Sequence, residues 1–369
     1  MKKILGINEL KSVLENTPRG SDSSNEMIQD GILKLFGKKM TVSELCLEIL
    51  SDIEKNGDSS LRKLCEKLDG STLENFEVSE VKINESLKKI SPEIIKSMEV
   101  AADRIRDFQL NILPSSWFDE NKGLGEIVRP IEKVLAYIPG GSAPLVSTVL
   151  MTAIPAKIAG VKDLIVTSPV KDNMEENPYI LAAAKVSGVD KVFNIGGAQA
   201  IAAFAVGTES IPKVDLICGP GNIFVTEMKK KVYGRVGIDG LFGPTETMII
   251  ADEKANPELC AADLIAQAEH DQLAFPILVT NSVELSKNVE ESLIEQLTEI
   301  KRNNIASKSL ENRGMNILVS DIDEAIEVAN LIAPEHLSLL VEEPESYIDN
   351  LNNSGGLFSG LIIPNVFGP

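Results

Sequence analysis

The amino-acid sequence predicts an α/β fold with two lobes, parallel-rich sheets and a helical N-terminal region. The chain has 369 residues, which is too long for one minimal domain and enough for two. Up to about Asp119, apolar and charged residues recur at helical spacing. Beyond that point, short β-branched runs alternate with alanine-rich helical stretches, which is typical of βαβ units on a parallel sheet.

Three regions follow from this pattern. Residues 1–130 form the helical region, with the clearest helical spacing over residues 42–55 and 92–108, and are expected to pack with the second lobe. Residues 131–240 form the first lobe, with strands near 133–138, 163–168, 191–195 and 214–218, and helices near 144–159, 178–187, 199–206 and 222–232. Residues 241–369 form the second lobe, with strands near 247–251, 276–280, 315–319 and 337–341, and helices near 257–270, 283–300 and 321–332. Both lobes are therefore expected to be Rossmann-like.

The composition excludes several classes of protein. Hydrophobic residues make up 43% and charged residues 25%, as in ordinary folded domains. The net charge of −19 would repel phosphate backbones and anionic membrane surfaces, so neither nucleic acid nor membrane is expected as a partner. The four cysteines form no CxxC pair, which fits a reduced, cytoplasmic setting.

No segment has the pattern of an exported or membrane-bound chain. The first residues contain no apolar core of signal-peptide length, so we expect no export. The most apolar stretch, residues 145–161, is interrupted by Pro155 and Lys157 and is shorter than the span of about 20 residues that crosses a bilayer. It is expected to be a buried helix.

Glycine-rich turns follow three strands of the first lobe, at 139–142, 196–198 and 219–222. They lie at the carboxyl ends of the strands, where open α/β sheets bind ligands, and helix N-termini there suit a pyrophosphate. Tyr137, Gln199 and Asn222 add hydrogen-bonding side chains at these turns. The GxGxxG fingerprint is absent, so glycines that only shape tight turns are the alternative explanation.

The chain has two histidines, and each has polar neighbours. Gln267 and His270 end a predicted helix with i, i+3 spacing, so that an amide oxygen and an imidazole could share a metal ion. The alternative is a surface or capping histidine. Glu335 and His336 enter a predicted strand after Pro334 and could transfer protons near neutral pH. The alternative there is a solvated loop pair.

Taken together, these segments resemble histidinol dehydrogenase over essentially the whole chain. The resemblance rests on five motifs in the family's order: Tyr137-Ile138-Pro139-Gly140-Gly141-Ser142, Gly196-Gly197-Ala198-Gln199-Ala200, Gly219-Pro220-Gly221-Asn222, Gln267-Ala268-Glu269-His270-Asp271 and Ala333-Pro334-Glu335-His336-Leu337.

The resemblance implies a homodimeric, zinc- and NAD-dependent enzyme that oxidises L-histidinol to L-histidine through a bound aldehyde. By position, the residues implied to contact NAD are Tyr137, Gln199 and Asn222. Gln267 and His270 would ligate Zn2+, and Glu335 and His336 would be catalytic. The implied substrate contacts are Thr245, Gln267, His270 and His336, with Thr245 standing where the family commonly has serine.

The sequence departs from the family at its end. Pro369 occupies the place of an aspartate that ligates zinc, and proline has no side-chain donor. The family's C-terminal segment, which brings a further zinc histidine and a glutamate into the neighbour's site, is missing from this sequence. We therefore expect a truncated member that binds NAD, holds little zinc and turns over histidinol negligibly.

Two rival interpretations stay open from the sequence. One is a truncated, catalytically impaired remnant that folds and binds nucleotide only, and tightly bound zinc in the purified protein would argue against it. The other is a zinc hydrolase that uses Glu335, but it gives Tyr137, Gln199 and Asn222 no role.

Overall fold

The computed structural model describes residues 1–16, 26–140, 145–170, 176–300 and 302–360. These residues divide into two compact units. The first lobe comprises residues 26–242, and the second lobe comprises residues 1–16 together with residues 243–360. The second lobe is therefore assembled from two separate parts of the sequence.

The first lobe is built on a five-stranded sheet in which all neighbouring strands are parallel. In spatial order its strands are β6 (Lys191–Phe193), β5 (Asp163–Thr167), β4 (Lys133–Tyr137), β7 (Leu216–Cys218) and β8 (Gly237–Ile238). The chain order reverses between β4 and β7. The carboxyl ends of these two strands therefore form the topological switch point at which open α/β sheets bind ligands.

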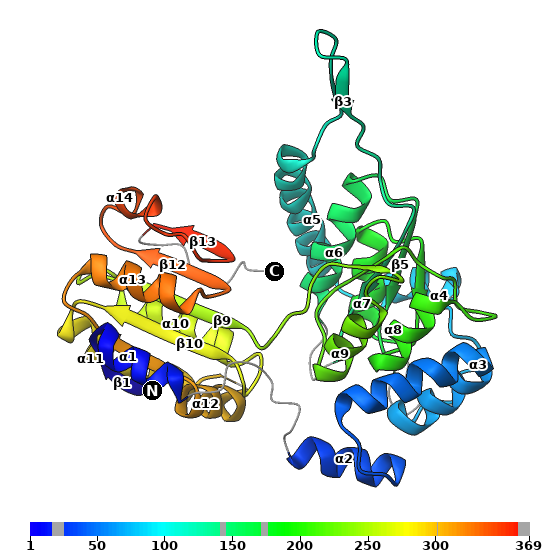
Figure 1. Ribbon diagram of the computed structural model, residues 1–369, viewed down its shortest axis with the longest axis horizontal. Helices are drawn as coiled ribbons and strands as arrows, with labels where there is room; N and C mark the ends of the chain where they lie inside the picture. Colours follow the sequence, from blue (N-terminus) through cyan, green and yellow to red (C-terminus); the bar gives the residue numbers. More distant parts are fainter. Residues whose placement is uncertain (17–25, 141–144, 171–175, 301, 361–369) are drawn as a thin grey trace. The chain divides into compact units, whose positions relative to one another are not determined.

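Helices cover both faces of this sheet (Figure 1). One face packs against α3 (Val42–Asp69), α8 (Gly197–Val206) and α9 (Ile223–Val232), with α2 (Glu26–Phe36) beside α3. The other face packs against α4 (Glu80–Lys88), α5 (Pro92–Ile112), α6 (Val146–Ile158) and α7 (Pro178–Val186). Leu135 and Tyr137 point to the first group and Ala136 and Ile138 to the second, as the alternation of a strand buried on both faces requires.

The packing of the N-terminal helices differs from the expectation for residues 1–130. Helix α3 buries Ile49, Ile53 and Leu61 in the same core as α8, so residues 26–130 belong to the first lobe. Only the first described segment, residues 1–16, lies in the second lobe.

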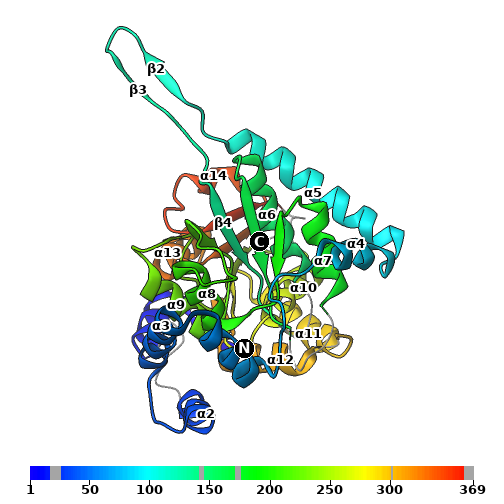
Figure 2. The same cartoon turned by 90° about the vertical axis from the view of Figure 1, so that its right-hand side faces the viewer.

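Two parts of the region expected to be helical contain strands. Residues Lys2–Leu5 form β1, which is followed by α1 (Gly6–Glu15). After α5, a hairpin of β2 (Trp117–Asp119) and β3 (Leu124–Glu126) projects away from the helices of the first lobe (Figure 2). Strand β1 pairs with a strand that is distant in the sequence, and β2 pairs with β3 across a turn. Helical periodicity in the sequence does not report either pairing.

The second lobe has a six-stranded sheet of parallel neighbours. In spatial order its strands are β1, β11 (Met315–Leu318), β10 (Phe275–Thr280), β9 (Glu246–Ala251), β12 (His336–Leu340) and β13 (Gly356–Ser359). One face packs against α10 (Pro257–Ala268), α11 (Val283–Leu297) and α12 (Asn303–Asn312). The other packs against α1 and α13 (Ile322–Ile332), with α14 (Glu345–Ile348) between β12 and β13.

Besides β1, the sequence pattern missed α12 and β13 in this lobe, and it located β9 to β12 and helices α10, α11 and α13. Within the described ranges, none of the helices combines the length and apolar character that a membrane span needs.

Candidate functional site

The glycine-rich turns of the first lobe pack closely against their neighbours. A Cβ atom added to Gly219, where φ is +110°, would lie 2.1 Å from the carbonyl oxygen of Tyr137. A Cβ atom added to Gly140 or Gly196 would lie 2.3 Å from the ring of Pro169. Any larger residue would displace these turns, so close packing by itself requires glycine at all three positions.

Tyr137 and Gln199 are buried beneath the turn that begins α8. The Gly197 N–H donates a hydrogen bond to the Tyr137 hydroxyl (3.0 Å), and Gln199 Nε2 donates to Asp69 Oδ2 (2.9 Å). Burial, with a smaller contribution from the nearby Asp69, raises the pKa of Tyr137 to about 12, and the hydrogen bond from Gly197 opposes this shift. These two side chains support the turn, and their contact with a cofactor stays a prediction.

Asn222 differs from them because it is exposed. Its Oδ1 accepts hydrogen bonds from the N–H groups of Phe224 and Val225 (both 3.1 Å). It therefore caps α9 next to the switch point, where N–H groups at a helix start would otherwise lack partners. Residues 141–144, part of the first predicted cofactor turn, lie outside the described residues.

The candidate residues of the second lobe gather at the amino edge of its sheet. Thr245 precedes β9, and its carbonyl oxygen accepts a hydrogen bond from the N–H of Phe275 at the start of β10 (2.8 Å). Glu335 precedes β12, and His336 is the first residue of that strand. Helix α10 runs from the end of β9 back to the start of β10, so its last turn, with Gln267, lies at the same edge.

Helix α10 begins and ends as its sequence predicts. Asn256 caps it by accepting from the Glu258 N–H (2.8 Å), and Pro257 occupies its first turn. Near its end, Gln267 is only 6% exposed, whereas His270 follows the helix and is exposed. The Gln267 amide is therefore buried, whereas the His270 imidazole lies at the surface.

His336 is the most unusual group at this edge. It is buried at 6% exposure, and its Nδ1 has no hydrogen-bond partner among the described residues. Burial lowers the pKa of His336, Glu335 raises it, and His270 lowers it further, so both neighbours lie within electrostatic reach. The His336 and Phe358 rings also lie at a steep angle to each other, with their planes at 72° and their centroids 6.3 Å apart. Buried nitrogen atoms are rarely left without a partner, which makes this one a natural place for a ligand or water.

The carboxylate of Glu335 is half-buried beside it. Its Oε2 accepts a hydrogen bond from the Glu246 N–H (3.4 Å), which ties the loop before β12 to the start of β9. The structure thus brings His270 within electrostatic reach of His336, which the sequence placed in a separate motif with Glu335, and it places Gln267 at the same edge of the sheet.

Three buried polar residues at this edge were missed from the sequence: Thr247, Asp263 and Ser338. Thr247 pairs with His336 across β9 and β12, and Ser338 donates to Asp263 Oδ2 (3.2 Å). Ser338 and His336 are alternate residues of β12 and share the face covered by α10. The i, i+4 spacing of Asp263 and Gln267 was the available signal.

The described residues do not complete a zinc site. Within them, no group of three or more His, Cys, Asp or Glu side chains is arranged to hold a metal ion. Gln267 and His270 provide two donors, and even open zinc sites take three from protein. Pro369, which stands at the family's aspartate position, lies outside the described residues.

Comparison with known proteins settles the family. The family model described as histidinol dehydrogenase matches residues 37–369. The chain belongs to the histidinol dehydrogenase family. A histidinol dehydrogenase of Lactococcus lactis is 44% identical to this chain over 344 residues, which are 91% of this chain and 80% of that protein. One from Aquifex aeolicus is 47% identical over 317 residues, covering 85% and 73%.

The fold comparison agrees with this family assignment. The crystal structure of histidinol dehydrogenase from Elizabethkingia anophelis matches with a TM-score of 0.90 at 34% identity, covering all of this chain and 82% of that one. This match confirms the α/β class with parallel sheets that the strand and helix pattern predicted.

Proposed function

We propose that this chain oxidises L-histidinol to L-histidine through L-histidinaldehyde with two NAD+, the final step of histidine biosynthesis. Membership of the family supports this reaction. The observation that carries the proposal is the buried imidazole of His336, whose Nδ1 lacks a protein partner in the described chain, next to the half-buried carboxylate of Glu335.

His336 and Glu335 are the proposed proton-transfer residues. A buried, neutral imidazole can accept the hydroxyl proton of the alcohol while hydride leaves the neighbouring carbon. NAD+ supplies the hydride acceptor in both oxidations. In the second oxidation, Glu335 takes a proton from the water that adds to the aldehyde. Glu335 is suited to this step because it is fixed by the Glu246 N–H yet remains partly accessible.

Thr245, Gln267 and His270 are the proposed substrate contacts. Their support is their position at the amino edge of the second sheet, with His336. A hydroxyl, an amide and an imidazole can bind the amino and imidazole groups of histidinol by hydrogen bonds.

NAD+ is proposed to bind at the carboxyl edge of the first sheet. Helices α8 and α9 begin there, and N–H groups at helix N-termini favour a pyrophosphate. The proposed contact residues are Tyr137, Gln199 and Asn222. Since Tyr137 and Gln199 are buried, we expect them to act by holding the turn before α8, while Asn222 is available at the surface.

Zinc has weaker support, and no step above depends on it. Gln267 and His270 supply only two protein donors, fewer than the three of open catalytic zinc sites, so they would bind Zn2+ weakly by themselves. We expect the 369-residue chain to retain much less than one equivalent of zinc after dialysis, as measured by atomic emission. A full equivalent that the substitution His270→Ala removes would show that other donors complete the site.

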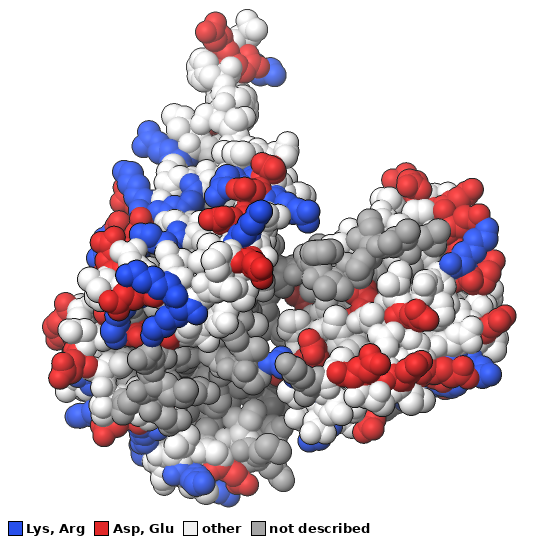
Figure 3. All heavy atoms as spheres, turned by 180° about the vertical axis from the view of Figure 1, so that it is seen from behind, with Lys and Arg blue, Asp and Glu red and all other residues white. Residues whose placement is uncertain are grey.

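A homodimer is proposed from the apolar surface of residues 108–131, which we call the apolar arm. Its exposed apolar side chains are Phe108, Leu110, Ile112, Leu113, Trp117, Phe118, Leu124, Ile127, Val128 and Ile131. Apolar patches of this size mark interaction surfaces, and an isolated hairpin is only marginally stable in water. In Figure 3 the visible stem of the hairpin carries few charges, and its charged side chains lie near the tip.

Sedimentation velocity tests the homodimer. Phe118→Glu should shift the chain to monomer, because a buried carboxylate in an apolar interface is unfavourable. Leu47→Glu is the control, since Leu47 is also exposed (50%, against 68% for Phe118) but lies on α3, outside the apolar arm. An unchanged dimer with Phe118→Glu would reject the apolar arm as the interface.

A cytoplasmic setting without nucleic acid or membrane partners is also proposed. All four cysteines are unpaired, which fits a reducing compartment. Acidic side chains are spread over the visible face of the second lobe (Figure 3), and the net charge is −19. Such a surface would repel phosphate backbones and anionic lipids.

Histidinol-dependent formation of NADH by the purified chain tests the enzyme function. The sequence alone predicts negligible turnover, but membership of the family favours the working enzyme, so the expected result is NADH production that requires histidinol and yields histidine. Binding of NAD+ without any turnover would instead favour the nucleotide-binding remnant, which the family matches do not favour. Turnover of an ester or amide without NAD+ would favour the zinc hydrolase.

A further inference from the structure

A buried ion pair in the first lobe has no role in the chemistry proposed above. Lys229 on α9 has a side chain that is 2% exposed, and its ammonium pairs with the carboxylate of Asp239, which follows β8 and is 25% exposed. A fully buried lysine is rare because removing its charge from water is costly. We propose that Lys229 and Asp239 are positioning residues that hold the Gly219–Asn222 turn in the geometry that accepts NAD+.

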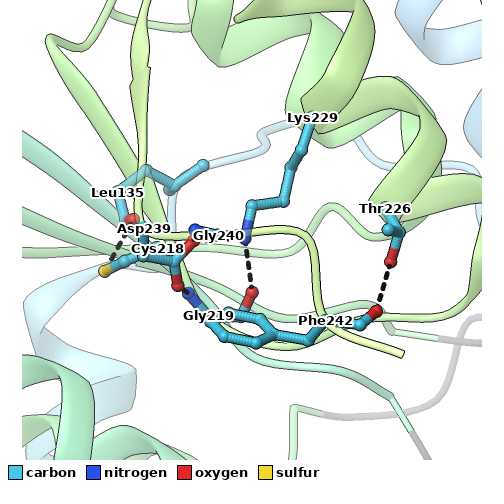
Figure 4. A network of polar contacts seen from close by, with 8 residues as sticks. All are labelled: Leu135, Cys218, Gly219, Thr226, Lys229, Asp239, Gly240 and Phe242. Carbon is cyan, nitrogen blue, oxygen red and sulfur yellow. Dashed lines mark hydrogen bonds and ion pairs between the residues drawn. The ribbon is translucent and has the colours of Figure 1, made fainter. Parts of the chain in front are cut away.

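The pair binds both polar backbone atoms of one glycine (Figure 4). Lys229 Nζ donates to the Gly219 carbonyl oxygen (3.0 Å), and Asp239 Oδ2 accepts from the Gly219 N–H (2.7 Å). Asp239 Oδ1 also accepts from the Gly240 N–H (2.8 Å). The orientation of the peptide groups on either side of Gly219 is therefore fixed by these two side chains.

This glycine occupies a position where orientation matters. It directly follows β7, at the switch point beside β4, and three residues before the exposed cap Asn222. Its φ of +110° and its contact with the Tyr137 carbonyl leave little room for adjustment. A small rotation at Gly219 would carry through Gly221 to Asn222 and to the start of α9.

The remaining contacts of the Lys229 ammonium are also with groups of the protein itself. The Phe242 ring lies 5.1 Å from Lys229 Nζ, and the Phe242 carbonyl accepts from Thr226 Oγ1 (3.3 Å). With Gly219, Asp239 and Phe242 around it, Lys229 acts through the turn and not on a ligand directly. This inference rests on the proposed NAD+ site.

The variants are Lys229→Met and the double variant Lys229→Met with Asp239→Asn. The single variant leaves the Asp239 carboxylate without its partner, which can destabilise the fold. The double variant removes both charges, so we expect it to fold even if the single variant does not. A second ion pair of the first lobe provides the control: Lys157 Nζ binds Asp190 Oδ2 (2.5 Å), which also accepts from the Leu164 N–H (2.7 Å). This pair lies at the amino edge of the same sheet, away from the proposed cofactor turns.

NAD+ binding is measured by calorimetry, and kcat and KM for NAD+ are measured where turnover is present. Lys229→Met and the double variant should raise the Kd for NAD+ about tenfold or more, since small misplacements of binding groups have large effects. Lys157→Met should leave the Kd within about twofold, and kcat at saturating NAD+ should change by less than about threefold in all variants.

Three results would overturn the inference in distinguishable ways. If the unmodified chain binds NAD+ and the folded double variant binds it equally well, the ion pair does not position the turn. If the unmodified chain shows no NAD+ binding at all, the cofactor site itself is wrong, and this inference falls with it. Equal losses of affinity in Lys229→Met and Lys157→Met would assign the effect to general destabilisation and also reject it.

Discussion

The two lobes share a strand order but carry their candidate residues at opposite edges of their sheets. The order β6-β5-β4-β7-β8 in the first lobe corresponds to β11-β10-β9-β12-β13 in the second, which adds β1 outside β11. In the first lobe, glycine-rich turns follow the strands at the carboxyl edge. In the second, the candidate residues precede the strands at the amino edge.

The carboxyl edge of the second lobe is closed by its own hydrogen bonds. Asp252 follows β9, and its carboxylate accepts from the N–H groups of Lys254 (2.9 Å) and Glu342 (2.8 Å). Lys254 and Glu342 also form an ion pair. The first lobe has glycines at the equivalent place. The shared strand order therefore gives both sheets a switch point at their carboxyl edge, and the residues that follow each strand decide whether a ligand can bind there.

The largest effect is expected from a substitution that removes only the chemistry proposed for the second lobe. His336→Ala should lower kcat by about 10²- to 10⁴-fold, because it removes the proposed general base. The Kd for NAD+ should stay unchanged, since the proposed cofactor turns belong to the first lobe. Steady-state kinetics and NAD+ titration check both, and a comparable loss of NAD+ affinity would contradict this division of roles.

The next largest effect is expected from a substitution that disturbs a glycine turn at the carboxyl edge of the first lobe. Gly219→Ala would place a Cβ 2.1 Å from the Tyr137 carbonyl at a φ of +110°, so we expect a loss of about 2–3 kcal/mol in the free energy of unfolding. NAD+ affinity should fall as well. Urea denaturation measures the stability.

A matched glycine gives the control for that substitution. Gly31 lies in α2, and a Cβ added there would meet no atom within 4 Å. Gly31→Ala should therefore be neutral or stabilise the chain by up to about 1 kcal/mol. A loss with Gly31→Ala similar to that with Gly219→Ala would show that close packing is not the cause.

A smaller effect is expected from the hydrogen bonds that join α3 to the loop after α8 in the first lobe. Asp58 Oδ2 accepts from Ser210 Oγ (2.6 Å), and Oδ1 accepts from Thr208 Oγ1 (2.5 Å). Burial opposes ionisation of Asp58, but these hydrogen bonds and the nearby Arg62 outweigh it and lower its pKa below the ordinary 3.8. Asp58→Asn should cost about 1–2 kcal/mol at pH 7.

The sign of the pH dependence follows from that lowered pKa. The carboxylate stabilises the fold above pH 3.8, and the contribution is lost as pH falls toward the lower folded-state value. The stability difference between the native chain and Asp58→Asn should therefore shrink on acidification to about pH 3. Urea denaturation at both pH values checks this, and a difference that stays constant would contradict it.

The smallest effect is the equivalent contact in the second lobe. Glu324 accepts from the Ser320 N–H (2.8 Å) and the Ile7 N–H (2.9 Å), and these bonds lower its pKa against the effect of burial. Glu324→Gln should cost about 0.5–1 kcal/mol near neutral pH, because the group is partly screened by solvent. Hydrogen exchange of residues 2–7 should increase in this variant, and an unchanged rate would exclude a role in holding β1 and α1.

Local pattern by itself determined much of the fold of this protein. The strands β4, β5 and β7 and helices α6 to α9 lie close to their predicted ranges, because apolar periodicity and glycine turns are properties of neighbouring residues. The same holds for the start of α10, which Asn256 and Pro257 mark in the sequence. The motif residues Glu335 and His336 were also recognisable, since residue types and spacing suffice to suggest their chemistry.

Only the tertiary structure decided which residues act together. Lys2–Leu5 becomes a strand because β11 offers it a parallel partner, although the surrounding sequence reads as helical. Asp263 and Ser338, which are 75 residues apart, meet because α10 covers the face of β12, and Lys229 is buried because Asp239 and Gly219 surround its ammonium. Such contacts join residues that are distant along the chain, and their energies depend on burial and geometry that local spacing does not encode.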